Sequence, residues 1–258
     1  MTVLGEKIIG VLSREPAAAD YCEEKEKTLN VENSLFLLKK EYPNFSQIVC
    51  GKKIIDFGCG DGYQAVALAL KEKCFVHAVD TNPKALEKAM LLAKEKKLSD
   101  KSIVFTNKIS KTQKKTFDVV ISQNSFEHFS DPDSILDEMK SLINDGGKLL
   151  ISFGPPWLTA YGSHMNFFCK FPWVNIIFSE KTVMNVRGRY VKDGAKKYEE
   201  VKSGLNKMTI SKFEKIIANS GLKIKYKKYA CSKNLNFLST IPFIKEFFTN
   251  RVTVILEF

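Results

Sequence analysis

Residues 54–62 read Ile-Ile-Asp-Phe-Gly-Cys-Gly-Asp-Gly, and this stretch decides how the rest of the chain is interpreted. An apolar run ends in Asp56, and glycines then occupy every second position: Gly58, Gly60 and Gly62. Residues 63–70, Tyr-Gln-Ala-Val-Ala-Leu-Ala-Leu, favour a helix and contain no breaker. Glycine tolerates positive φ and lets a ligand approach the backbone, and a helix N-terminus presents unpaired N–H groups. The stretch therefore predicts a strand, a tight ligand-binding turn and the start of a helix.

The second anchor is Asp80, which ends the apolar run at residues 75–79. In a βαβ unit, an acidic residue at the end of the second strand meets the hydroxyls of a ribose lying across the first turn. The alternative is an ordinary α/β turn with an exposed aspartate. The order of strand, glycine turn, helix and acid favours the nucleoside site.

The spacing of the glycines indicates which nucleoside the turn binds. Dinucleotide sites have G-x-G-x-x-G, whereas this turn has G-x-G-x-G, with the carboxylates of Asp56 and Asp61 around it. Negative charge at this place disfavours a pyrophosphate and favours a cationic ligand. S-adenosylmethionine has a ribose, an amino group and a sulfonium, and it has no phosphate.

The sequence Asp-Phe-Gly-Cys-Gly-Asp-Gly resembles the first motif of the class I S-adenosylmethionine-dependent methyltransferases (type 11-like), and the resemblance covers about residues 52–153. It implies a doubly wound, Rossmann-like α/β fold: a seven-stranded, mostly parallel sheet, helices on both faces, and a substrate-side insertion after the fifth strand. It also implies S-adenosylmethionine as cofactor. The implied cofactor-binding residues are Asp56, Gly58, Cys59, Gly60, Asp61, Gly62, Asp80, Thr81, Asn107, Ile109, Gln123 and Asn124.

The chain departs from the family pattern after the third strand, where an acidic residue usually binds the adenine amino group. Asn107 is the nearest substitute here, and Ile109 is a candidate to flank the ring. Gln123 and Asn124 follow the fourth strand, so we expect them near the methionine end of the cofactor.

Apolar runs and helix-forming stretches alternate along the core. The expected strands are 54–57, 75–79, 102–106, 117–122 and 148–153, with helices at 63–72, 83–97 and 133–143 between them. Such an alternation demands parallel pairing and right-handed crossovers. Asp145-Gly146-Gly147 predicts a turn. A helix at 208–220 and strands at 222–229 and 251–258 then complete the seven-stranded sheet that the resemblance implies.

Four parts are expected within a single methyltransferase domain. They are an N-terminal helical cap (1–50), a cofactor-binding core (51–153), an aromatic substrate insertion or lid (154–207) and a completion of the sheet (208–258). Tyr21 in the cap is a candidate lid residue, although packing is its more ordinary role.

The stretch 153–178 holds eight aromatic residues and follows the fifth strand, where substrate loops lie in such sheets. It predicts a methyl acceptor with an apolar or sugar face. Residues 179–207 are polar and rich in lysine, and predict a mobile lid or an inserted hairpin.

Two histidines are candidates for a general base. His164 lies inside the aromatic stretch and could take a proton from a substrate hydroxyl; a hydrogen bond within the loop explains it equally well. Glu127 and His128 could form an acid–base pair, but the start of a helix that fixes the loop after the fourth strand is the more ordinary explanation. Three scattered histidines without an acidic cluster predict no catalytic metal.

The net charge of +11 comes from the last part of the chain, since residues 154–258 carry 18 basic and 7 acidic groups. The asymmetry suggests an anionic partner: nucleic acid, a phosphorylated substrate or a membrane surface. The lysines are scattered, which slightly favours an ordinary solvated surface. Neither composition nor motif specifies an oligomeric state.

Six cysteines, at positions 22, 50, 59, 74, 169 and 231, form no C-x-x-C pair. Without a signal peptide they indicate reduced thiols and a cytoplasmic protein. No apolar run approaches 18 residues, so no membrane span is predicted.

The favoured function is transfer of a methyl group from S-adenosylmethionine to an oxygen or nitrogen of a small molecule, of a saccharide or secondary-metabolite type. Two alternatives stay open: an RNA methyltransferase that uses the basic C-terminal third, and a non-catalytic protein that only binds the cofactor. The intact Asp56, Gly58, Gly60 and Asp80 favour an enzyme over the latter.

Overall fold

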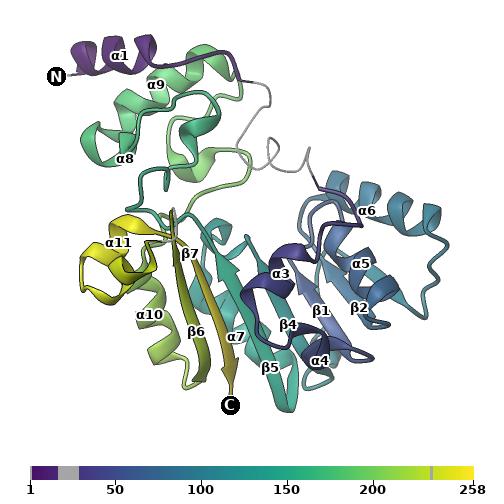
Figure 1. The fold of residues 1–258 in the computed structure, drawn as a ribbon. Coiled ribbons are helices and arrows are strands. Elements are labelled where there is room, and N and C mark those ends of the chain that lie inside the picture. The colour runs from purple at the N-terminus through teal and green to yellow at the C-terminus, as the bar shows by residue number, and fades with distance from the viewer. Residues whose placement is uncertain (1, 17–28, 233–234) are drawn as a thin grey trace.

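A twisted sheet of seven strands carries helices on both faces, and a smaller helical cap stands at one end of it, as the computed structural model in Figure 1 shows. The structure describes residues 2–16, 29–232 and 235–258. The strands are β1 (Lys53–Phe57), β2 (Phe75–Val79), β3 (Ile103–Thr106), β4 (Phe117–Gln123), β5 (Ile143–Phe153), β6 (Lys223–Cys231) and β7 (Thr249–Glu257).

The strand order is β3-β2-β1-β4-β5-β7-β6. Strands β1 to β5 pair in parallel, and β7 runs antiparallel to both β5 and β6. Chain order reverses between β1 and β4, and in such sheets ligands bind outside the carboxyl ends of the strands at this point. The predicted fold class, a seven-stranded and mostly parallel Rossmann-like sheet, is confirmed.

Helices cover the two faces of the sheet and bury separate apolar clusters against it. One face carries α3 (Phe36–Glu41), α4 (Phe45–Val49), α5 (Tyr63–Lys71) and α6 (Pro83–Glu95). The other carries α7 (Pro132–Leu142) and α10 (Ile210–Asn219). The buried positions of α10 explain this packing, because Ile210, Phe213 and Ile217 recur at helical spacing on one side.

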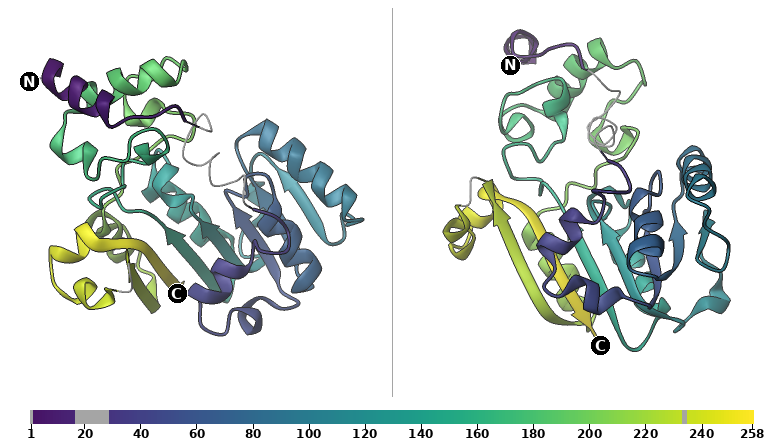
Figure 2. Two further views of the ribbon diagram at one scale, coloured as in Figure 1. Left: turned by 45° about the horizontal axis from the view of Figure 1, so that its top comes forward. Right: turned by 45° about the vertical axis from the view of Figure 1, so that its right-hand side comes forward.

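The cap has a core of its own (Figures 1 and 2). It consists of α1 (Thr2–Val11), α8 (Val174–Ile177), α9 (Glu180–Tyr190) and the 3-10 turns η3 (Met165–Phe167) and η4 (Tyr198–Glu200). Helix α1 packs beside α9, so the expected N-terminal helices divide between two places: α1 lies in the cap, and α3 and α4 lie on the sheet. Tyr21 lies outside the described residues.

A mobile lid or an inserted hairpin was predicted for 179–207, and the hairpin is wrong where the helix α9 forms. Ser179 caps this helix, because its hydroxyl accepts a hydrogen bond from the Thr182 N–H (3.3 Å). Arg187 on the same helix is fully buried and donates two hydrogen bonds to the carboxylate of Asp193 (2.8 and 2.6 Å). This two-bond ion pair joins α9 to the segment that follows it.

The turn predicted at 145–147 lies inside β5, which begins five residues earlier than expected. Phe117 pairs with Ile143, but Val119 pairs with Lys148, so the chain bulges between the two pairs. Gly146, at φ +83°, permits this excursion before the ladder resumes. The remaining short elements are η1 (Lys111–Gln113), η2 (Phe126–His128), η6 (Asn236–Thr240) and α11 (Ile244–Phe248).

The last glycine of the turn has a packing role that alanine cannot fill. Gly62 has φ +80°, and a Cβ there would lie 2.5 Å from the Cβ of Ala89 on α6. Gly51 has φ +68°, but a Cβ added to it would meet nothing within 4 Å. Substitution of Gly51 therefore measures only the free-energy cost of placing alanine in this backbone conformation. We expect Gly51→Ala to lower the free energy of unfolding by about 1 kcal/mol and Gly62→Ala by about 2–4 kcal/mol. Urea unfolding measures both losses; equal losses would contradict the packing role.

Candidate active site

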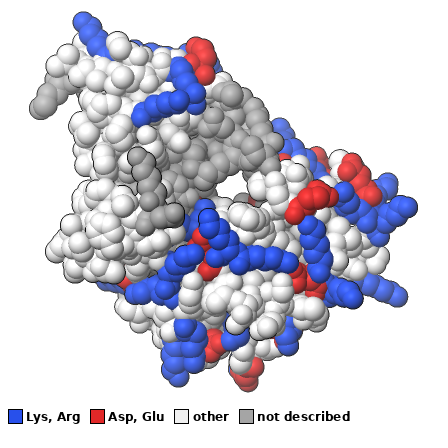
Figure 3. Space-filling model, in the orientation of Figure 1, with Lys and Arg blue, Asp and Glu red and all other residues white. Residues whose placement is uncertain are grey.

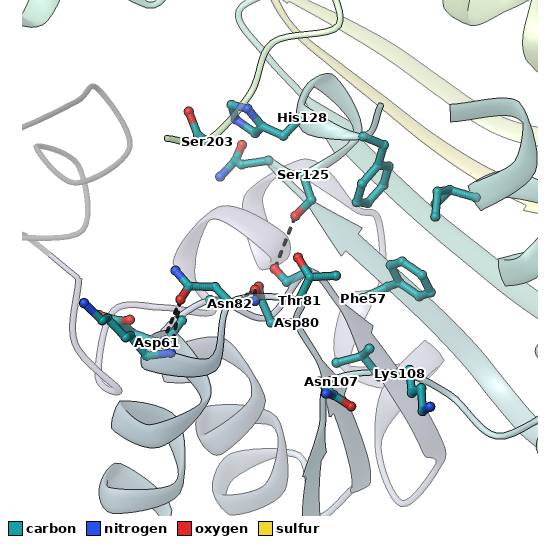
Figure 4. A pocket seen from close by; sticks show the side chains of 18 of the residues that line it. Phe57, Asp61, Asp80, Thr81, Asn82, Asn107, Lys108, Ser125, His128 and Ser203 are labelled. Carbon is teal, nitrogen blue, oxygen red and sulfur yellow. Dashed lines mark hydrogen bonds between the residues drawn. The ribbon is translucent and has the colours of Figure 1, made fainter. Parts of the chain in front are cut away.

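A cavity of about 570 Å³ opens at the carboxyl ends of β1, β2, β3 and β4, where the strand order reverses. Its walls come from the glycine turn, the end of β2, the loops after β3 and β4, and a segment that descends from the cap (Figure 4). The predicted residues that line it are Gly58, Gly60, Asp61, Asp80, Thr81, Asn107, Ile109, Asn124 and His128. Its size is within the range of small-molecule sites, about 300–1,000 Å³.

Asp80 is held at the end of β2 by the turn that it faces. Its Oδ2 accepts a hydrogen bond from the Gly60 N–H (2.8 Å), and its Oδ1 accepts one from the Asn82 N–H (2.8 Å). A carboxylate has about four lone-pair sites, so each oxygen can accept one more hydrogen bond. The side chain is thus fixed in place and still able to receive a pair of hydroxyls.

The glycine turn is clamped to the loop after β4. The Ser125 hydroxyl donates to the Gly58 carbonyl oxygen (3.2 Å), and a Cβ on Gly58 would lie only 2.5 Å from that hydroxyl oxygen. The N–H groups of Gly58 and Cys59 both donate to the carbonyl oxygen of Val79 (2.8 and 3.0 Å). The turn therefore needs glycine at position 58 and is tied to two neighbouring strands.

Four predicted residues support the turn without lining the cavity: Asp56, Cys59, Gly62 and Gln123. Cys59 is buried, which raises the pKa of its thiol far above the ordinary value, so the sulfur stays protonated. Asp61 does line the cavity and accepts a hydrogen bond from the Lys88 ammonium (2.8 Å). It is therefore partly neutralised.

Asp56 is 1% exposed and accepts a hydrogen bond from the Gln64 amide (2.6 Å). Burial raises the pKa of its carboxyl to about 7; the Gln64 hydrogen bond opposes this shift, and the charge of Asp80 adds to it. Because the pKa is higher in the folded than in the unfolded chain, the folded state keeps a proton that the unfolded state releases. This group therefore destabilises the fold as pH rises from about 4 to about 7.

We expect Asp56→Asn to remove that pH dependence. The difference in free energy of unfolding between variant and parent should shift in favour of the variant as pH rises across this interval, by about 1–4 kcal/mol in total. Chemical unfolding at a series of pH values measures it, with the exposed Asp100→Asn as a control that should give a flat difference. A flat difference for Asp56→Asn as well would refute the assignment.

His128 is the candidate base that the fold brings to the cavity (Figure 4). Its Nδ1 lies 2.7 Å from the carbonyl oxygen of Gly204. A carbonyl oxygen can only accept, so Nδ1 carries the hydrogen and, in the neutral ring, Nε2 is left as the basic nitrogen. His164, 4% exposed, lies next to it with ring centroids 5.4 Å apart, but it does not line the cavity.

Glu127 has a different partner from the one that an acid–base pair with His128 requires. It is 3% exposed, and its Oε1 accepts a hydrogen bond from the Gly154 N–H (3.1 Å). It thereby joins the loop after β4 to the end of β5.

Some residues at the cavity could not be predicted from any pattern in the sequence. Lys202 and Ser203 reach the cavity from the cap, about 75 residues beyond His128. Arg251 on β7 donates from Nη1 to Oδ1 of Asn124 (2.6 Å), which itself has φ +54°. These are long-range contacts that only the fold creates.

The aromatic stretch 153–178 contributes no ring to this cavity within the described part of the chain. Phe167 and Phe168 are buried in the cap core, and Trp157 packs edge-on against Tyr198 with centroids 4.8 Å apart. The rings at the cavity are instead Phe57 and Phe129, in a T-shaped pair at 5.8 Å. Several rings of the stretch thus belong to the core of the cap, together with apolar side chains from α1 and α9.

Within residues 2–16, 29–232 and 235–258, no group of three or more His, Cys, Asp or Glu side chains is placed to hold a metal ion. The cysteines in these ranges are free thiols. No described helix is both long and apolar enough to cross a membrane.

Comparison with known proteins shows which family the core of the chain resembles. Residues 48–157 match the family model described as "Methyltransferase domain". A ubiquinone biosynthesis O-methyltransferase of Neisseria meningitidis serogroup A is 26% identical over 145 residues, which cover 55% of this chain and 61% of that protein. The enzyme of the same name from Thiobacillus denitrificans is 33% identical over 105 residues, covering 40% and 45% of the two chains. The chain thus spans about three fifths or less of these relatives' length.

Solved structures match over more of the chain. A SAM-dependent methyltransferase from Aquifex aeolicus aligns with a TM-score of 0.52 and 15% identity, covering 92% of this chain and 98% of that one. A geranyl diphosphate C-methyltransferase from Streptomyces coelicolor A3(2), in complex with S-adenosyl-L-homocysteine, aligns with a TM-score of 0.57 and 12% identity, covering 91% and 81%. At these identities the structures establish the fold. Together with the family match, they confirm the resemblance to the class I methyltransferases.

Proposed function

We propose that this chain, whose residues 48–157 form a methyltransferase domain of the class I fold, transfers a methyl group from S-adenosylmethionine to a hydroxyl group of a small molecule. The observation that carries the proposal is one cavity lined by the glycine turn, by Asp80 and by His128, whose Nδ1 donates to the Gly204 carbonyl oxygen. The matched relatives named as O-methyltransferases support the choice of oxygen over nitrogen.

The residues of the cavity fit this cofactor. The Asp80 carboxylate keeps acceptor sites for a ribose diol, and the glycine turn beside it is held in place by the Ser125 hydroxyl. Asn107 and Ile109 offer an amide and an apolar side chain for an adenine ring. The Asp80 carboxylate at the end of β2 faces the cavity, where a negative charge disfavours a phosphate at that place.

S-adenosylmethionine supplies an activated methyl group on a sulfonium, so the protein needs mainly to place the acceptor oxygen in line and to exclude water. His128 has the further task of receiving the hydroxyl proton at Nε2 as the new carbon–oxygen bond forms. The Gly204 carbonyl oxygen then stabilises the positive imidazolium through the Nδ1–H bond. The cap segment at Lys202 and Ser203 borders the acceptor end of the cavity.

The acceptor that suits these walls is a compact hydroxylated molecule with an apolar face. Phe57 and Phe129 form an apolar wall, and the Lys202 side chain at the edge of the cavity adds positive charge.

The test is transfer of a labelled methyl group from S-adenosylmethionine to a panel of phenols, hydroxylated acids, saccharides and RNA. We expect transfer to a hydroxylated small molecule, and binding of S-adenosylhomocysteine without binding of NAD. Selective labelling of RNA would instead support a nucleic-acid enzyme. Tight cofactor binding without transfer to any class of acceptor would support a non-catalytic binding protein.

A further inference from the structure

The connection between β6 and β7 exposes large apolar side chains at the edge of the sheet. Six of them, which we name the apolar tip, are between 38% and 84% exposed: Leu235, Phe237, Ile241, Phe243, Phe247 and Phe248. They lie on η6 and α11 or directly beside the ends of these elements, which project beyond the strands in Figure 1. Contiguous exposure of this kind marks an interaction site in a folded protein.

The backbone of the tip holds its aromatic rings outward. The Ile244 N–H donates to the Pro242 carbonyl oxygen (2.8 Å), which makes a tight turn around Phe243 at φ +64°. The Phe243 side chain is 84% exposed as a result.

Negative charge is turned away from the tip. Within residues 235–248 the charged side chains are Lys245 and Glu246. Glu246 is 6% exposed, and its carboxylate accepts hydrogen bonds from the N–H groups of Ile210 (2.9 Å) and Ser211 (2.7 Å) at the start of α10. The outer surface of the tip is therefore apolar and carries no acidic group.

The same flank of the molecule continues this pattern in the cap. Helices α1 and α8 lie on the side of the tip in Figures 1 and 2, and Figure 3 shows the surface over α11 as largely uncharged. Their exposed apolar side chains are Val3, Leu4, Val11, Ile176 and Ile177. Exposed lysines accompany them at Lys7, Lys170 and Lys181, whereas the carboxylate of Glu6 pairs with Arg189.

We propose that the apolar tip, with the exposed faces of α1 and α8, binds the surface of an anionic lipid bilayer. Projecting aromatic side chains enter the interfacial region of a bilayer, and neighbouring lysines are attracted to anionic headgroups. A stable pair of protein copies needs about 800 Å² from each partner and about 20–30 residues a side. The six side chains of the tip fall short of that number, and the faces of α1 and α8 lie on separate elements, whereas shallow insertion into a bilayer needs no matching partner surface.

The test is sedimentation with vesicles of phosphatidylcholine, with and without phosphatidylglycerol. We expect binding that needs phosphatidylglycerol and weakens with salt, and a loss of about tenfold or more in Phe237→Ser/Phe243→Ser. The matched control is Met90→Ser/Leu91→Ser on α6, whose side chains are 48% and 61% exposed on another element. It should bind vesicles as the parent does.

Cofactor binding by both variants, measured in the absence of lipid, should equal that of the parent, which keeps this test separate from the proposed methyl transfer. Equal vesicle binding by the tip variant and the parent would overturn the proposal. So would a dimer in light scattering that the tip variant dissociates, with no binding to vesicles, since the surface would then join two copies of the chain.

Discussion

Replacing Asp80 with alanine is expected to weaken the binding of S-adenosylhomocysteine by about 10- to 150-fold, or about 1.5–3 kcal/mol. The Asp80 carboxylate faces the cavity and is fixed by the N–H groups of Gly60 and Asn82. A hydrogen bond from a hydroxyl to a charged carboxylate is stronger than one between two neutral groups. The variant also loses the acceptor of the Gly60 N–H, so the turn itself becomes less well ordered. Calorimetry measures the loss directly.

Asp80→Asn separates these two effects. Asparagine keeps one acceptor oxygen for the Gly60 N–H but loses the charge, so its affinity should lie between those of the alanine variant and the parent. Asp100→Ala, at an exposed position outside the cavity, should bind as the parent does. Undiminished affinity in Asp80→Ala would remove the assignment of the second-strand acid to the ribose.

The edge of the cavity formed by the glycine turn and Asp80 could be predicted because its information is local. Gly58, Gly60 and Asp80 stand at fixed positions relative to two apolar runs, and a parallel sheet brings the ends of those runs to one edge. The same locality explains the correct prediction of a mostly parallel sheet, since alternating strands and helices allow few topologies.

The acceptor side could not be predicted in this way. Ser203 and Gly204 reach His128 only because the cap folds back over the sheet, and no periodicity encodes that return. The aromatic stretch at 153–178 was interpreted by its place after β5, whereas several of its rings are buried in the core of the cap. Arg187 illustrates the same limit: a basic residue in a polar segment proves to be fully buried, because Asp193 six residues later pairs with it.

The largest effect is expected at His128. A positioned general base contributes typically 10²–10⁴-fold, so His128→Ala should lower kcat for methylation of a hydroxyl by about that factor. Affinity for S-adenosylhomocysteine should change little, because the histidine lies at the acceptor end of the cavity, away from Asp80 (Figure 4). A fall in kcat with unchanged cofactor affinity is the signature of an interaction made in the transition state.

His128→Asn tests the base separately from the loop that it holds. The asparagine amide can still donate to the Gly204 carbonyl oxygen but cannot accept the proton, so kcat should fall nearly as far as in the alanine variant. His164→Ala is the matched comparison, since this buried ring contacts His128 without lining the cavity. We expect it to lower kcat by about tenfold or less, through looser packing of His128.

Parent activity should fall in acid, where a protonated imidazole cannot accept a proton, and activity that remains in the His128 variants should lose this dependence. Near-normal turnover in both His128 variants, together with a large loss in His164→Ala, would transfer the role of base to His164; small losses in all three would leave alignment of the acceptor as the source of catalysis.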